Sequence, residues 1–165
     1  MSEFKFPTEE IELPSKGLIY SKDNPLSSGK VEIKYMTAKE EDILSNQSFI
    51  QKGNVLEKLL KSVIINKDIN IDDLIVGDKN ALLIATRILG YGKDYEISVK
   101  GTSYVLDMST LENKEFDEKQ FEAGKNEFTF TTPATGTVLT YQLATGKVEK
   151  QIDREVAGLK KLNKE

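Results

Sequence analysis

The spacing of apolar residues changes abruptly near residue 37. Val31, Ile33 and Tyr35 alternate with polar residues, which predicts a half-buried strand. Residues 37–40, "TAKE", form a capping-box pattern, in which Thr37 and Glu40 exchange hydrogen bonds at the start of a helix. The sequence therefore predicts that a strand passes into a helix at Thr37.

Apolar residues then recur at helical spacing in three successive segments. The first predicted helix starts at Thr37 and fades near residue 51, and the second covers 54–65. The third covers 78–89, with Asp78 as its N-cap, and is apolar around most of its circumference. We therefore expect helix 78–89 to be the most buried element, with Ile84 and Ile88 in the core.

Alternation with a period of two returns after "GYG" at 90–92. Apolar residues alternate at 95, 97 and 99 and again at 104, 106 and 108, which predicts two strands that form a hairpin around Gly101. A second hairpin is predicted from Phe128 and Phe130 and from the segment 138–143, with its turn at 132–136. The acidic stretch 111–126 between the hairpins predicts a loop with at most one helical turn.

The last predicted element is an amphipathic helix over about 146–162. Most of its positions are charged, and its apolar residues form one narrow stripe. Such a stripe docks either on the rest of the chain or on a partner protein. We take it as the candidate partner-binding surface, which consists of Val148, Ile152, Val156, Leu159 and Leu162.

These elements together predict an α+β fold. We divide the chain into an extended N-terminal segment (1–29), one α+β domain (30–143) and a C-terminal helix (144–165). Within the domain, three helices occupy 37–90, and an antiparallel β part occupies 93–143. A chain of 165 residues suits one domain with a small appendage.

The composition narrows the possible chemistry. The chain has no cysteine and no histidine, which excludes disulfides, thiolate zinc sites and catalytic sites built on histidine. Its net charge of −4 does not favour binding to nucleic acid, and no apolar run is long enough to span a bilayer. The N-terminal residues lack the pattern of a secretory signal, so we expect an intracellular protein.

Three adjacent acids, Glu40, Glu41 and Asp42, are the most conspicuous candidates for acid–base chemistry or metal binding. Consecutive helical side chains point about 100° apart and do not converge on one point. Acids in the first turn of a helix are instead favoured by its macrodipole. We therefore predict a capping role for these residues, and no catalytic, metal or cofactor site.

The order of three segments is distinctive. "LPSKGLIY", "NPLSSGKVEIKYMTAKEEDIL" and "DDLIVGDKNALLIATRILGYGKDYEI" together resemble the baseplate hub assembly family of T-even-type contractile-tailed bacteriophages. The resemblance covers roughly residues 11–112, about two-thirds of the chain. It implies a small non-enzymatic virion-assembly protein without cofactors, whose partners are hub or tail proteins of the phage.

The resemblance implies action in the host cytoplasm during virion assembly, with retention in the virion baseplate if the protein is a structural component. It leaves open whether the protein is such a component or a transient chaperone for a tape-measure or hub subunit. Two other readings of the sequence are a small carboxylate-based enzyme and a nucleic-acid-binding module. The partner and the oligomeric state stay open, and we expect contact with neither membrane nor nucleic acid.

Overall fold

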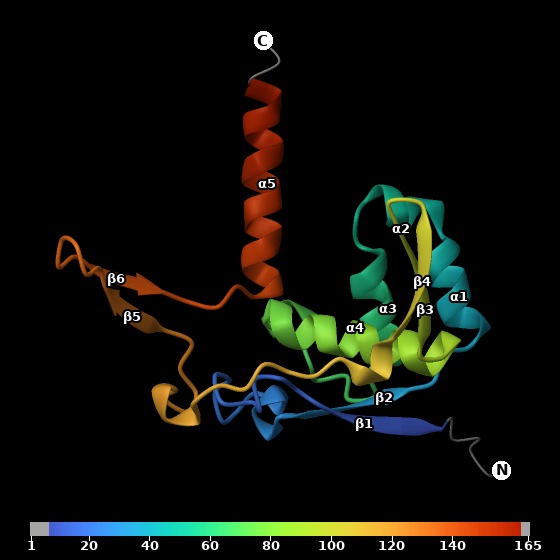
Figure 1. Cartoon of the computed structure of the whole chain (residues 1–165), viewed down its shortest axis with the longest axis horizontal. Coiled ribbons are helices and arrows are strands. Elements are labelled where there is room, and N and C mark those ends of the chain that lie inside the picture. The colour runs from blue at the N-terminus through green and yellow to red at the C-terminus, as the bar shows by residue number, and fades with distance from the viewer. Residues whose placement is uncertain (1–6, 163–165) are drawn as a thin grey trace.

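The computed structural model describes residues 7–162, and its mixture of helices and antiparallel strand pairs confirms the α+β class (Figure 1). The strands in this part of the chain form three separate two-stranded pairs rather than one sheet. One pair and four helices enclose the core. The last pair and the last helix extend from it, and the middle pair follows the end of the fourth helix (Figure 1).

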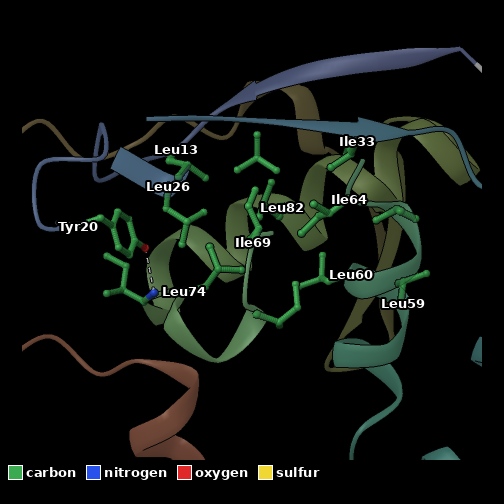
Figure 2. Close-up of a cluster of buried hydrophobic side chains, with 14 of the residues drawn as sticks. Leu13, Tyr20, Leu26, Ile33, Leu59, Leu60, Ile64, Ile69, Leu74 and Leu82 are labelled. Carbon is green, nitrogen blue, oxygen red and sulfur yellow. Dashed lines mark hydrogen bonds between the residues drawn. The ribbon is translucent and has the colours of Figure 1, made fainter. Parts of the chain in front are cut away.

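The first pair joins β1 (Thr8–Glu12) to β2 (Lys30–Lys34). Val31 and Ile33 of β2 are buried, which confirms the predicted strand and its buried face. Between β1 and β2 the chain makes a compact excursion with a 3-10 turn at Pro25–Ser28. Residues of this excursion, including Leu13 and Leu26, belong to the core, so the N-terminal segment packs with the helices (Figure 2).

The two ends of this excursion cross at Gly17 and Gly29. Both glycines have positive φ, 75° and 71°, and their backbones lie against each other. A Cβ on Gly17 would lie 2.6 Å from the Gly29 nitrogen, and a Cβ on Gly29 would lie 2.7 Å from the Lys16 carbonyl oxygen. Atoms of the backbone cannot move aside as a flexible side chain can, so the crossing admits no side chain at either position.

We therefore expect Gly29→Ala to destabilise the chain by about 3 kcal/mol, of which about 1 kcal/mol comes from the positive φ. Gly53→Ala is the matched control, because Gly53 has a φ of 68° but nothing within 4 Å of a Cβ. Urea unfolding of both variants measures the difference. Equal losses for the two variants would contradict the close crossing.

The predicted helix over 37–51 is two helices, α1 (Ala38–Ser45) and α2 (Gln47–Gln51). The break lies at Asn46, whose backbone is extended and whose side-chain oxygen accepts a hydrogen bond from the Phe49 N–H at 3.2 Å. Asn46 therefore ends one helix and caps the next. The second predicted helix is α3 (Val55–Val63), and Leu59, Leu60 and Val63 form its buried face.

Helix α4 (Val76–Tyr91) begins two residues before the predicted start, and Asp78 is not its N-cap. Ile75 holds that position in an extended conformation, because it bridges to Thr145 and the Val76 N–H donates to the Ala144 carbonyl at 3.0 Å. Asp78 lies inside the first turn, where its carboxylate is fully buried. A contact distant in sequence therefore moved the helix start.

The expectation that α4 is the most buried element is wrong. The buried apolar residues come mainly from the N-terminal excursion, β2, α3 and the turn before α4, and Leu82 is the one fully buried leucine that α4 itself supplies (Figure 2). Ile84 and Ile88 are only half-buried and are absent from the core cluster. The apolar residues of α4 cover much of its circumference, and the core cluster is met by Leu82 and by the partly buried Leu83, Ala85 and Leu89.

The remaining elements extend from this core. The hairpins β3–β4 (Asp94–Val99 and Thr102–Asp107) and β5–β6 (Phe128–Thr131 and Val138–Tyr141) confirm both predicted strand pairs. A 3-10 turn at Glu118–Gln120 lies in the intervening loop, as expected. Helix α5 (Gly146–Leu162) has the predicted bounds and stands away from the core (Figure 1).

Candidate interaction surface

The candidate stripe on α5 lies mostly in solvent. Val148 near the base is half-buried, while Ile152, Val156 and Leu159 are 51%, 42% and 59% exposed. Every residue from 151 to 160 is exposed, so the described part of the stripe beyond the base packs on nothing. The side chain of Leu162 lies outside the described residues. Of the two alternatives, docking on the rest of the chain does not occur in this structure.

The base of α5 is held firmly. The Gly146 N–H donates to the Leu74 carbonyl at 3.0 Å. The Lys150 ammonium lies 2.5 Å from a carboxylate oxygen of Asp72 and 2.9 Å from one of Glu57, and Lys79 pairs with Glu149. The hydrogen bond to Asp72 raises the pKa of Lys150, so this cation stays charged at neutral pH. These contacts fix the direction in which α5 leaves the core.

A second exposed apolar face lies on the β3–β4 hairpin. The register pairs Tyr95 with Leu106 and Ile97 with Tyr104, so these four side chains share one side of the ribbon. Tyr104 is 53% exposed, and Tyr95 and Leu106 are also exposed. A two-stranded ribbon is marginally stable alone and needs a further layer over its apolar face.

The β5–β6 hairpin repeats this arrangement. Phe128 pairs with Tyr141 and Phe130 with Leu139, which places all four on one face, whereas Thr129 and Thr140 lie on the other. Phe130, Leu139 and Tyr141 are about half-exposed. At the root of this face, the Phe128 ring stacks on Tyr141 with centroids 5.4 Å apart. The outer part of the face is open.

We call the β3–β4 hairpin, the β5–β6 hairpin and residues 151–162 of α5 the three arms. Together they give the chain a large surface. It exposes 12143 Å² to solvent, whereas a compact chain of its mass would expose about 8,200 Å². Obligate protein assemblies bury roughly 2,000–5,000 Å² summed over both partners, or about half of that on each chain. The exposed apolar side chains of the arms have the character of surfaces that partners cover.

The three acids at 40–42 do not converge, as predicted. Glu41 and Asp42 are exposed, but Glu40 is fully buried. Its carboxylate forms the predicted capping box and accepts hydrogen bonds from the Thr37 N–H at 2.9 Å and the Thr37 hydroxyl at 2.6 Å. It also accepts from the Ser62 hydroxyl and pairs with the Lys34 ammonium at 2.7 Å. Glu40 thus joins β2, α1 and α3.

The electrostatics of Glu40 follow from these contacts. Burial raises the pKa of its carboxyl, but hydrogen bonds from Lys34, Ser62 and Thr37 outweigh burial and lower the pKa to about 2. The group is ionised at neutral pH with all its partners in place. Its role is structural, because the carboxylate is buried and a substrate in solution could not reach it.

A second buried carboxylate, Asp78, holds the N-terminal excursion against α4. It accepts from the Ser15 N–H at 2.9 Å, the Ser15 hydroxyl at 2.6 Å and the Tyr20 hydroxyl at 2.6 Å. The Tyr20 oxygen in turn accepts from the Ile75 N–H at 3.1 Å (Figure 2). Burial, together with the bond to Asp78, raises the pKa of Tyr20, so its proton stays in this network.

Among the described residues there is no cluster of acidic side chains that could hold a metal ion. A hollow of about 420 Å³ lies between α3 and the base of α5, and two carboxylates in its wall, those of Glu57 and Asp72, are already paired with Lys150. Over the described range, no helix has the length and hydropathy needed to cross a membrane.

Sequence reasoning located the α5 stripe but did not recognise the hairpin faces as part of an interaction surface. Their signal was present, because apolar residues alternate in both strands of each hairpin. Alternation by itself predicts a half-buried strand, and it does not say whether the apolar side meets the core of the same chain. The buried roles of Asp78 and Glu40 had no signal beyond helix capping.

Comparisons with known proteins add no relative: no protein-family model, curated protein or solved structure matches the chain.

Proposed function

We propose that this protein is a non-enzymatic interaction factor that acts in assembly of the baseplate hub of a contractile-tailed phage. The observation that carries the interaction role is the set of three arms, on each of which at least three large apolar side chains are exposed in the described part of the chain. Such faces are uncommon on proteins that act alone, and they mark sites of protein–protein contact.

The phage setting rests on the resemblance of three sequence segments. These segments meet in the fold: Ser15 and Tyr20 of the first bond Asp78 of the third, and Gly29 of the second crosses Gly17 of the first. The resemblance therefore concerns one packed structural unit rather than scattered surface residues. An assembly role for that unit agrees with arms that extend from it towards partners.

Co-expression with the hub and tail proteins of a contractile phage tests the proposal. We expect the chain to co-elute with at least one of them in size-exclusion chromatography. Tyr104→Lys should weaken that complex by about tenfold or more, because it puts a charge in an apolar contact. Ser103→Lys, on the other side of the same strand, is the matched control. Elution apart from every hub and tail protein would overturn the proposal.

The same proposal covers two fates for the protein, and virion composition separates them. A structural hub component is present in purified particles at fixed stoichiometry. A transient chaperone for a tape-measure or hub subunit is absent from them but is recovered from assembly intermediates. Quantitative mass spectrometry of both samples distinguishes the two.

A further inference from the structure

We propose that two copies of this chain pair by packing the apolar stripe of α5 from one copy onto the apolar face of the β5–β6 hairpin of the other. This inference goes beyond the assembly role and does not depend on the phage setting. It rests on the match between the two surfaces, on the charge around them, and on the contacts that keep them apart within one chain.

Each of the two surfaces lacks a packing partner, and each can provide the apolar layer that the other needs. The stripe presents aliphatic side chains, chiefly Ile152, Val156 and Leu159, on an isolated helix. The hairpin presents the exposed apolar side chains of Phe130, Leu139 and Tyr141 on a ribbon without a second layer. A helix laid across a two-stranded ribbon gives both elements a common apolar core, which neither has alone.

The charges around the two surfaces are complementary. Beyond its base, α5 carries three basic and two acidic side chains over 151–162, whereas 111–127, which lead into the hairpin, carry six acidic and three basic ones. At the root of the hairpin face, a hollow is lined by Phe121, Phe128 and Tyr141 together with Glu122, Glu127 and Lys125. Since Lys125 pairs with Glu122 at 3.0 Å, one carboxylate of this hollow is in excess.

A basic side chain beside the stripe fits this excess charge. Lys160 follows Leu159 on α5 and is exposed. With Leu159 on the hairpin face, the four-carbon stem of Lys160 is long enough to bring its ammonium towards Glu127. The attraction between an acidic and a basic region also favours this pairing over pairing of two basic helices.

The stripe and the hairpin face of one chain are held apart in this structure, although only residues 142–145 separate them. Leu143 exchanges two hydrogen bonds of 2.9 Å with the Asn126 side chain, and the next residue, Ala144, accepts from Val76 at 3.0 Å. The base of α5 is held by the ion pairs of Lys150. The helix and the hairpin therefore leave the core in different directions (Figure 1).

Contact between copies avoids this restriction. If each copy donates its helix and accepts the helix of the other, the two contacts are equivalent and the pair closes as a two-fold dimer. Both contacts then form together, so each helps to hold the other. In such a dimer, the β3–β4 hairpin of each copy stays available for a different partner.

Cysteine cross-linking tests the contact directly, because the natural chain contains no cysteine. Leu159→Cys and Leu139→Cys are made in separate chains, mixed and oxidised. We expect a disulfide that joins the two variants. The matched pair Ala157→Cys and Thr140→Cys, on exposed positions off the two apolar faces, should cross-link several-fold less. The proposal would be overturned if the two pairs cross-linked equally well. It would also be overturned if Leu159→Cys chains cross-linked with each other as readily as with Leu139→Cys chains.

Sedimentation equilibrium of the isolated full chain gives an independent measure. We expect a reversible dimer, with Leu159→Lys and Leu139→Lys each raising its dissociation constant by about tenfold or more. Ala157→Lys and Thr140→Lys should leave it within about twofold, since they add the same charge off the contact. Circular dichroism checks that each variant is folded. A chain that is monomeric at every concentration would refute the dimer without touching the proposed assembly role.

Discussion

Leu82→Asp should abolish folding, whereas Ile84→Asp, two residues away on the same helix, should leave a folded protein. Leu82 is fully buried among the core leucines and isoleucines, and no cation lies in the core cluster to pair with a new carboxylate (Figure 2). The change loses about 2 kcal/mol of apolar burial and adds several kcal/mol for an unpaired buried charge. That sum approaches the total stability of an ordinary domain, about 5–15 kcal/mol.

Ile84 is half-buried and lies outside the core cluster, so a carboxylate there keeps access to water. We expect Ile84→Asp to cost roughly 2 kcal/mol. Far-ultraviolet circular dichroism and urea unfolding of both variants measure the contrast. If Ile84→Asp lost more stability than Leu82→Asp, the core would lie against the other side of α4 from the one described.

The second large effect concerns pH and Glu40. The pKa of this carboxyl is about 2 in the folded chain against an ordinary 4.5, so the unfolded chain takes up the proton first as the pH falls. The stabilisation is complete above the ordinary pKa of 4.5 and is lost as the pH falls through about 2. A shift of this size corresponds to roughly 3 kcal/mol.

Glu40→Gln isolates this contribution. An amide cannot ionise, and its N–H₂ group cannot accept the hydrogen bonds that Lys34 and Ser62 donate to the carboxylate. The variant should be about 3 kcal/mol less stable than the natural chain at pH 7, and the gap should close towards pH 2. Asp42→Asn, at an exposed neighbouring acid, is the control. A gap that stays constant with pH would show that Glu40 does not titrate as described.

Elements with local signals could be predicted well. Both hairpins, the capping box at Thr37 and the bounds of α5 depend on residues close together in the sequence. Period-two alternation and helical stripes reflect geometry that a short segment carries with it. The divergence of the three acids at 40–42 could be predicted for the same reason, because the angle between consecutive helical residues is a local property.

Features that depend on distant contacts could not be predicted. Asp78 is of a residue type that commonly caps helices, but the bridge between Ile75 and Thr145 starts α4 before it. Ser15 and Tyr20, some sixty residues earlier in the chain, then bind its buried carboxylate. Ile84 and Ile88 are as apolar as Leu82, and only the docking of the N-terminal excursion and α3 selects the side of α4 that is buried. Sequence pattern ranks residues by hydrophobicity and cannot tell which apolar face meets another.

The three arms, which carry the proposed function, combine features that are local in the sequence with features that depend on distant contacts. The apolar stripe of α5 and the apolar side of each hairpin follow from the sequence alone, because side-chain direction follows from secondary structure. That these faces stay exposed depends on how the elements pack in three dimensions. Hydrogen bonds at residues 143–146 and the ion pairs of Lys150 hold the stripe of α5 away from the hairpin that could cover it, and so leave both for another molecule.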